Sequence, residues 1–272
     1  MIILFRLLAI LPLWLLHAIG AAVGWLSFLA SPTYRRRFVA NARQAGYELA
    51  QVRPAVAESG KLLAELPRLW FGRPVPVQWD GQALIEQALA KGRGIVFLTP
   101  HLGCFEVTAQ GVAARYGRIT VLYRPARKAW LRELVDSARA RPNLATAPTT
   151  LAGVKQMLKA LKAGEAVGLL PDQVPPQGLG LWVPFFGREA YTMTLSARLA
   201  QQTGATVLLV WGERLAWGRG YCLHFRAWPD ELASEPGLAA AQVNAQMERL
   251  IQECPGQYLW GYARYKTPRQ DK

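Results

Sequence analysis

The 272-residue chain is poor in cysteine and in acidic residues, and each scarcity narrows what it can be. Its three cysteines, Cys104, Cys222 and Cys254, are far apart and form no C-x-x-C pair, so the sequence predicts neither a disulfide framework nor a structural zinc site. Only 18 Asp and Glu oppose 32 Lys and Arg, which leaves a net charge of +14. That surplus predicts an anionic partner: nucleic acid, anionic lipid or an acidic protein. Because 51% of the residues are hydrophobic, the composition excludes a disordered chain.

Three common catalytic motifs are also missing from the sequence. It contains no H-E-x-x-H, no G-x-x-x-x-G-K-[ST] and no G-x-S-x-G, which argues against a metalloprotease, a P-loop nucleotide hydrolase and a serine hydrolase. We therefore expect neither a metal nor a cofactor. The chemistry left open is general-base catalysis on a substrate hydroxyl.

The first thirty residues contain a long uncharged run, Leu7 to Ala30, that spans roughly 36 Å if it is helical and so could cross a bilayer. The run is too long for a cleaved signal peptide and ends in a basic segment, so we expect it to be retained. Arg6 alone precedes it, whereas Arg35, Arg36 and Arg37 follow, which predicts a cytoplasmic location for the rest of the chain. A helix lying in the interface is the alternative, and both predict a membrane partner rather than nucleic acid.

Beyond this run, short apolar segments alternate with helical patterns and no linker divides them. We expect strands at 94–99, 119–123, 166–170, 206–214 and 221–226, helices at 103–116, 129–141, 151–163, 193–203 and 238–254, and a Pro/Gly-rich loop from 171 to 188. Such alternation predicts an α/β fold: a single domain with a mainly parallel sheet flanked by helices, preceded by an N-terminal hydrophobic membrane-anchor helix. The predicted anchor is residues 1–30 and the predicted domain is residues 31–272.

In open α/β sheets, functional sites lie where strands end and helices begin, which makes the segment 99–106 the first candidate. It contains His101 and, five residues on, Glu106. We expect Glu106, in the first turn of a helix, to orient the imidazole of His101 so that its other nitrogen acts as a general base. His101 as a simple helix cap and Cys104 as a nucleophile are the alternatives.

The chain resembles the bacterial lipid A late acyltransferases, which belong to the lysophospholipid acyltransferase superfamily with its H-x4-[DE] motif. The resemblance rests on the hydrophobic N-terminus, on His101 to Glu106, and on the segments 123–125, 171–173, 183–187, 192–194, 257–260 and 264–267, together with the helix containing Arg139 and Arg141. The segment 175–178 differs in composition from that of relatives. The resemblance implies an O-acyltransferase that moves a fatty acyl chain from acyl carrier protein to a hydroxyl of a lipid A precursor at the cytoplasmic face of the inner membrane. It also implies His101 and Glu106 as a catalytic dyad, with Arg139 and Asp172 as further functional positions.

The residues themselves agree with acyl transfer. The reaction passes through an oxyanion, for which we expect backbone amides near Gly103 and an arginine to be donors. Arg124, directly after a strand, is a further candidate for the crevice. From Arg115 to Arg141 the chain has eight basic and two acidic residues, which suits an acidic carrier protein or an anionic headgroup. Two alternatives stay open: an acyltransferase that uses acyl-CoA on another glycolipid or a lysophospholipid, and a non-catalytic protein that binds anionic membranes.

Overall fold

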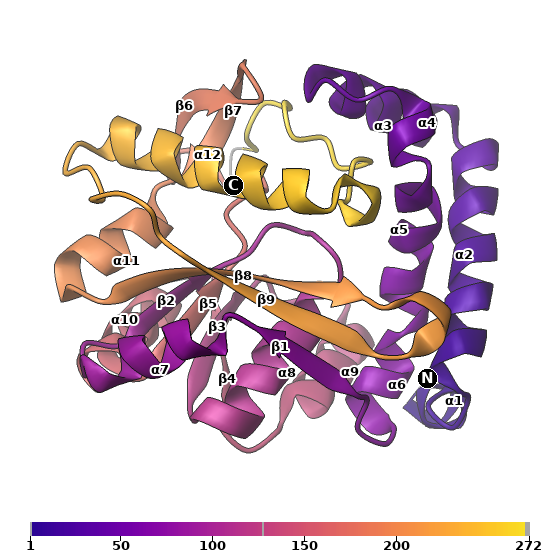
Figure 1. Ribbon diagram of the computed structural model, residues 1–272, viewed down its shortest axis with the longest axis horizontal. Helices are drawn as coiled ribbons and strands as arrows, with labels where there is room; N and C mark the ends of the chain where they lie inside the picture. The colour runs from indigo at the N-terminus through magenta and orange to yellow at the C-terminus, as the bar shows by residue number, and fades with distance from the viewer. Residues whose placement is uncertain (1, 127, 270–272) are drawn as a thin grey trace.

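The computed structural model describes residues 2–126 and 128–269 and confirms the predicted α/β class. Its strands form one seven-stranded sheet and a separate hairpin (Figure 1). The strands are β1 (Val77–Asp80), β2 (Ile95–Leu98), β3 (Ile119–Tyr123), β4 (Leu144–Pro148), β5 (Ala166–Leu169), β6 (Gly180–Phe185), β7 (Arg188–Met193), β8 (Thr206–Arg214) and β9 (Tyr221–Ala227). The order in the large sheet is β1-β9-β8-β2-β5-β3-β4, and all its neighbours are parallel except β8 and β9.

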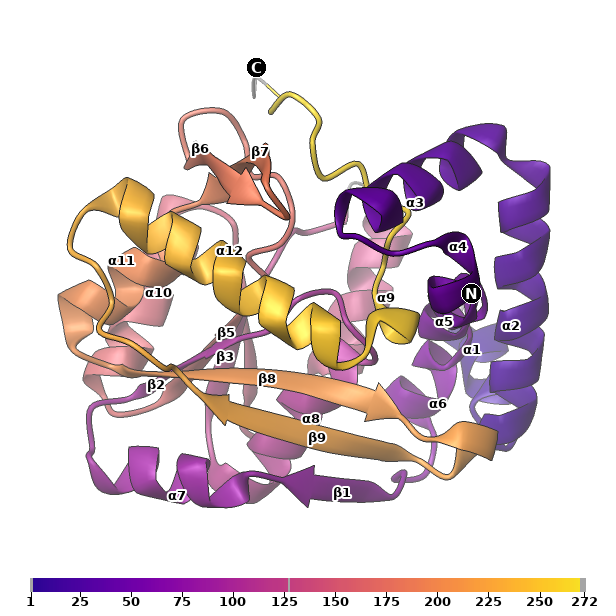
Figure 2. The ribbon, with the colours of Figure 1, turned by 45° about the horizontal axis from the view of Figure 1, so that its top comes forward.

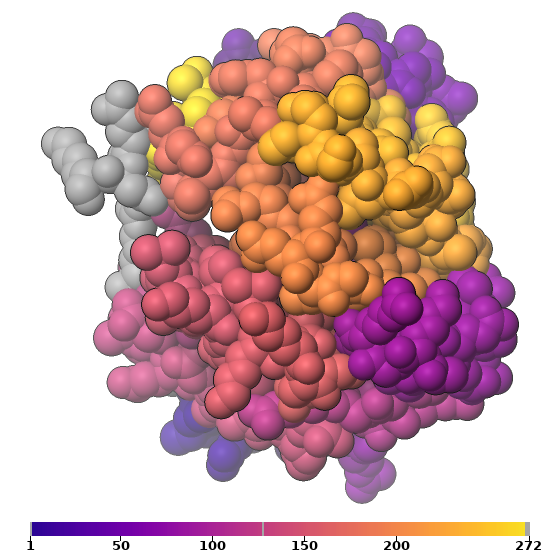
Figure 3. Space-filling model, turned by 90° about the vertical axis from the view of Figure 1, so that its left-hand side faces the viewer, coloured from indigo at the N-terminus to yellow at the C-terminus, as the bar shows by residue number. Residues whose placement is uncertain are grey.

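Helices cover both faces of this sheet, because the central strands are apolar on both sides. Along β2, Ile95 and Phe97 join one core cluster and Val96 and Leu98 join the other. The first face carries α7 (Gln82–Ala90), α8 (Phe105–Tyr116) and α9 (Ala129–Arg139). The second carries α10 (Leu151–Lys162), α11 (Leu195–Thr203) and α12 (Pro236–Glu253), and Figure 3 shows α7, α10, α11 and α12 on the side away from the N-terminal helices.

The N-terminal quarter of the chain is helical and packs along one side of the sheet domain (Figure 2). Its helices are α1 (Ile2–Leu8), α2 (Leu13–Ala30), α3 (Pro32–Gln44), α4 (Leu49–Val52), α5 (Pro54–Ala64) and α6 (Leu66–Phe71). The predicted continuous helix from Leu7 to Ala30 is wrong in one respect, because the chain breaks between α1 and α2. Pro12 has no N–H to donate and directly precedes α2, where a proline is tolerated. The 18 residues of α2 are still apolar and long enough for a candidate membrane span.

The predicted loop from 171 to 188 is also partly wrong, because it contains β6, which pairs antiparallel with β7. Strands β1 and β4 were likewise not predicted. The chain beyond α12 forms a short turn, η2 (Pro255–Gln257), and then runs beside the loop after β2. Another short turn, η1 (Ala216–Gly218), connects β8 to β9.

Candidate active site

The loop between β2 and α8, which carries His101, is held by hydrogen bonds from its own backbone. The N–H of Gly103 donates to the carbonyl of Gln257 (3.0 Å) and the N–H of Cys104 to that of Gly212 (2.7 Å). Gly103 has φ +57°, and a Cβ there would overlap the carbonyl oxygen of Gly212, so only glycine fits. These two amides are therefore already engaged. The expectation that they serve as oxyanion donors is wrong for this structure.

His101 meets Asp172, which comes from the end of a different strand. Nδ1 of His101 lies 2.7 Å from Oδ1 of Asp172, and the backbone N–H of His101 donates to Oδ2 at 2.9 Å. Leu98 of β2 and Leu169 of β5 are register partners; His101 follows Leu98 by three positions, and Asp172 follows Leu169 by three positions. Parallel neighbours end at the same edge of the sheet, which explains why residues at equal offsets meet. This equal offset is the signal in the sequence that could have predicted the pair.

The protonation states of this pair follow from its surroundings. Burial alone would raise the pKa of Asp172, but the charge of His101, the two hydrogen bonds from it and the charge of buried Arg264 together outweigh burial, and the net shift is downward. An ionised carboxylate only accepts hydrogen bonds, so Nδ1 of His101 carries the proton. Nε2 is then the basic nitrogen, as a general base requires.

Glu106 has different partners from those predicted. It accepts hydrogen bonds from Nε1 of Trp70 (3.0 Å) and from Nη2 and Nε of Arg139 (2.8 and 3.3 Å). The expected hydrogen bond between Glu106 and His101 is thus replaced by contacts to α6 and α9. Since α8 begins only at Phe105, Glu106 lies in its first turn beside those helices, while the ring of Phe105 packs edge-on against the imidazole at 5.1 Å. Spacing in the sequence brought His101 and Glu106 near each other but did not fix which way each side chain points.

The other arginines near the site have separate surroundings. Arg141 donates to the carbonyls of Leu69 and Trp70 and to Oε1 of Gln110, so it joins α6 to the start of β4 and to α8. Burial lowers the pKa of its guanidinium, although the charge of Glu106 opposes that shift. Arg124 is exposed just after β3 and lies at the same edge of the sheet as the ends of β2 and β5. Arg127 of the basic segment lies outside the described residues.

A buried ion cluster beneath the His101 loop was not predicted at all. Glu65, fully buried, accepts from Nη2 and Nε of Arg214 (2.7 and 2.8 Å), contacts Nε2 of His17 (3.0 Å) and accepts from the hydroxyl of Tyr221 (2.9 Å). Desolvation by burial opposes ionisation, yet Arg214 and His17 hold the pKa of Glu65 at about 2. Arg214 also donates to the carbonyl of Gly103 at 2.9 Å, so the cluster supports the loop directly.

Cys104 lies above this cluster and is fully buried. Burial, together with the nearby charge of Glu65, raises the pKa of its thiol well above the usual value. A neutral, inaccessible thiol is a poor nucleophile, which disfavours the covalent alternative. Among the described residues, no group of three His, Cys, Asp or Glu side chains is arranged to hold a metal ion.

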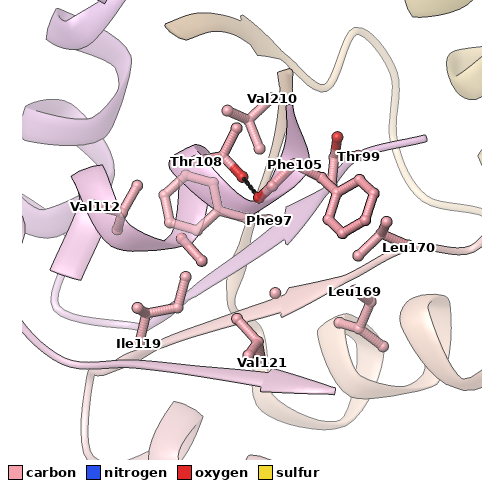
Figure 4. Close-up of a pocket in the computed structure, with 12 residues that line it drawn as sticks. Phe97, Thr99, Phe105, Thr108, Val112, Ile119, Val121, Leu169, Leu170 and Val210 are labelled. Atoms are coloured by element: carbon pink, nitrogen blue, oxygen red, sulfur yellow. Dashed lines mark hydrogen bonds between the residues drawn. The ribbon is translucent and has the colours of Figure 1, made fainter. Parts of the chain in front are cut away.

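A narrow apolar cavity lies between α8 and the sheet, and Phe105, which packs on His101, forms part of its wall (Figure 4). Thr99, two residues before His101, lies near one end with Phe105, and Val112 and Ile119 lie near the other. The cavity volume is about 30 Å³, so a long apolar ligand enters only when lining side chains move apart. Its walls are apolar except for two threonines and are formed by Phe97, Thr99, Phe105, Thr108, Ala109, Val112, Ile119, Val121, Gly168, Leu169, Leu170 and Val210.

The sequence matches the family of bacterial lipid A biosynthesis acyltransferases over residues 1–267. It is 31% identical over 216 residues to the lipid A biosynthesis lauroyltransferase of Escherichia coli K12, a match that covers 76% of this chain and 69% of that protein. The palmitoleoyltransferase of the same strain is 28% identical over 213 residues, with the same coverage. A lipid A biosynthesis acyltransferase of Haemophilus influenzae is 24% identical over 191 residues, covering 67% of this chain and 57% of that protein. The match to the family spans nearly the whole chain, and the chain therefore belongs to the bacterial lipid A biosynthesis acyltransferases.

Proposed function

We propose that this acyltransferase transfers a fatty acyl chain from acyl carrier protein to a hydroxyl of a lipid A precursor, with His101 as the general base. The observation that carries the proposal is the arrangement at the sheet edge. There, Asp172 orients the imidazole of His101 so that Nε2 is basic, and Phe105, whose ring packs on that imidazole, forms part of the wall of an apolar cavity. Family membership supports the choice of acceptor. The choice of donor rests on the resemblance noted from the sequence.

The acyl transfer needs only one group that accepts and returns a proton. Nε2 of His101 takes the proton of the acceptor hydroxyl while that oxygen attacks the thioester carbon. When the tetrahedral intermediate collapses, the new C–O bond remains, the C–S bond breaks, and the leaving thiolate takes the proton back from the imidazolium. Asp172 stays ionised throughout and stabilises the transient positive charge on His101.

Glu106 and Arg139 contribute to the site as positioning residues. Their bidentate ion pair, completed by Trp70, ties the first turn of α8 to α9 and α6. Because Phe105 in that turn packs on the imidazole, the position of α8 sets one wall of the space beside His101.

The acyl chain lies in the apolar cavity, whose wall includes Phe105 beside the base. Burying each methylene contributes about 0.8 kcal/mol, so the inner end of the cavity selects chain length. Strand β3 contributes Ile119 and Val121 to the wall, and β5 contributes Gly168 and Leu169.

The donor carrier approaches over α9 and the end of β3. Arg124, Lys128 and Arg132 are exposed there, on the same sheet edge as His101, and form a basic surface suited to an acidic carrier protein. Acyl-CoA is also anionic, but it has less surface than a protein to engage several separate arginines.

The protein binds the cytoplasmic face of the inner membrane through the outer side of α1 and α2. Along the full length of α2 the opposite side is buried against α5 and the domain, including His17 and the closely packed Gly20 and Gly24. A transbilayer α2 would take the charged residues packed on this side into the hydrocarbon, which is costly. We therefore propose that α2 lies in the plane of the interface, with its exposed stripe in lipid: Trp14, Ile19, Val23, Leu26 and Leu29.

A reconstituted assay tests the function. The purified protein in detergent is given a lipid A precursor and the same acyl chain on acyl carrier protein or on coenzyme A, and products are followed by mass spectrometry. We expect acylated precursor, faster turnover with the carrier protein, and a rate that falls as salt rises. Lys128→Glu should slow the carrier-dependent reaction. Its matched control is Lys162→Glu, an exposed lysine at the end of α10, remote from the ends of β2 and β5.

Absence of any acylated product would overturn the proposed function. Equal or faster turnover with acyl-CoA would overturn only the choice of donor. That result would favour the alternative, an acyltransferase that uses acyl-CoA as its donor.

A further inference from the structure

The chain beyond α12 lies directly against the loop that carries His101. Leu102 and Tyr258 form an antiparallel bridge, flanked by hydrogen bonds from Gly103 N–H to the Gln257 carbonyl (3.0 Å) and from Leu259 N–H to the His101 carbonyl (3.1 Å). Residues 257–259 therefore act as an added strand, which fixes the backbone of the loop at His101.

This added strand is itself fixed at its start. The side chain of Gln257 donates to the carbonyl of Arg214 (3.0 Å) and accepts from its N–H (2.9 Å), at the end of β8. Trp260, almost fully buried, donates from Nε1 to the carbonyl of Pro255 at 2.8 Å. Tyr258 thus sits between two anchored neighbours, so its side chain has a defined direction.

That direction is toward Asp172. The hydroxyl of Tyr258 donates to Oδ2 of Asp172 at 3.3 Å, the same oxygen that accepts from the backbone N–H of His101. Tyr258 is 5% exposed, so the partner of its hydroxyl is Asp172 rather than solvent. Both the length of the bond and its sharing with another donor indicate a modest energy, but the bond constrains the carboxylate on the side opposite the imidazole.

The electrostatic effect on Asp172 has a definite sign. Each hydrogen bond that an ionised carboxylate accepts stabilises part of its negative charge. If the Tyr258 hydroxyl is removed, more of the negative charge is directed at the imidazole, and protonation of His101 becomes easier. The base would then be lost at a higher pH than in the wild-type enzyme.

We propose that Tyr258 is a positioning residue for the His101–Asp172 pair: its hydroxyl holds the carboxylate in register with the imidazole, and the C-terminal strand is thereby part of the catalytic site. This inference rests on the proposed function of His101 as a general base. The proposal gives the segment after α12 a chemical role in addition to its packing against the domain.

The test compares Tyr258→Phe with Tyr265→Phe, using the full-length protein in detergent. Tyr265 belongs to the same C-terminal segment, but its hydroxyl donates to the carbonyl of Phe185 (2.9 Å) and not to Asp172. For Tyr258→Phe we expect kcat/KM to fall roughly three- to tenfold, and the acid limb of its pH profile to move to higher pH. Tyr265→Phe should leave the acid limb where it is in the wild type. An unmoved acid limb in a folded Tyr258→Phe protein would overturn the proposal.

A double-mutant cycle supplies the second readout. If Tyr258 acts through Asp172, Tyr258→Phe should change the rate less than about twofold in an Asp172→Asn background. A loss equal to that in the wild-type background would mean an independent structural role and would overturn the proposal.

The titration of the His101 imidazole by NMR, with its signal assigned by loss in His101→Ala, needs no substrate. The midpoint should move in Tyr258→Phe and not in Tyr265→Phe. A protein that shows this difference but acylates no lipid A precursor would refute the proposed function and leave the inference about Tyr258 standing.

Discussion

Nδ1 of His101 lies 2.7 Å from Oδ1 of Asp172, although 71 residues separate them in the chain. The pair exists because β2 and β5 are parallel neighbours whose ends meet at one edge of the sheet. With Asp172 ionised, the imidazole is held in the tautomer that leaves Nε2 unprotonated. This arrangement determines the first prediction.

Replacing either member of the pair should remove most of the activity without unfolding the protein. His101→Ala and Asp172→Asn should each lower kcat by a factor of about 10² to 10⁴, the range of a correctly positioned general base. Cys104→Ala should retain most of the activity and is the control in the same loop. The measurement is the initial rate of precursor acylation, with circular dichroism to verify folding. Retention of more than a tenth of the wild-type rate in His101→Ala would place the base elsewhere.

Glu106 should behave as a structural partner of Arg139. Glu106→Gln leaves the largely buried Arg139 without its counter-charge and should cost about 3 kcal/mol of unfolding free energy. The double variant with Arg139→Gln should lose less than the sum of the two single losses, because the ion pair is then absent on both sides. Chemical denaturation measures both. A stable Glu106→Gln protein that has lost 10²-fold or more of its activity would instead restore Glu106 as the partner of His101.

These two predictions depend on side-chain partners that could not be predicted from the sequence. Local patterns were enough for β2, β5 and the helices after them, because short buried strands and helices ending at glycine are encoded within a few residues. The partners of His101 and Glu106 depend instead on the order of strands in the sheet and on where α8 begins. Family resemblance selected Asp172 and Arg139 as functional, but it did not say which residue each one contacts.

The structural features that the sequence did not predict have two different origins. The hairpin of β6 and β7 was hidden by the prolines and glycines around it, although its pairing is local. The cluster of Glu65, Arg214 and His17 joins three distant segments, and a histidine in an apolar run gives no sign of a buried carboxylate partner.

The cavity predicts a change of chain-length preference at Gly168. A Cβ there would lie 3.3 Å from Cγ1 of Val121 and 3.6 Å from Cδ1 of Ile119, so Gly168→Ala narrows the cavity without backbone strain. We expect kcat/KM to fall about fourfold for each methylene that no longer fits, so that shorter donors become preferred. Competition between donors of two lengths, read by mass spectrometry, measures the ratio. Gly237→Ala, at the start of α12, is the control, and an unchanged ratio in Gly168→Ala would place the acyl chain elsewhere.

The placement of α2 predicts that both of its ends lie on one side of the membrane. In a protein whose native cysteines are replaced by alanine, single cysteines are introduced as Arg6→Cys and Thr33→Cys, at exposed positions before and after α2. In sealed inside-out inner-membrane vesicles, a membrane-impermeant maleimide should label both. Labelling of Arg6→Cys only after permeabilisation would show that the segment spans the bilayer.

The ion cluster predicts a specific loss of stability in acid. The pKa of Glu65 is about 2 in the folded protein, against 4.5 as its ordinary value, so the folded state binds this proton less readily than the unfolded state. The stabilisation is fully present above about pH 4.5 and is lost as the pH falls from there toward 2, by an amount on the order of 3 kcal/mol. Urea denaturation of the detergent-solubilised protein at pH 7 and pH 3.5 measures the part lost between these pH values, about 1.4 kcal/mol. Glu65→Gln should be less stable at pH 7, because buried Arg214 loses its partner, and its stability should depend less on pH in this window. Glu248→Gln is the control, since burial raises the pKa of Glu248 and its contribution has the opposite sign. If Glu65→Gln and the wild type lost equal stability between the two pH values, the cluster would not be the source of the acid sensitivity.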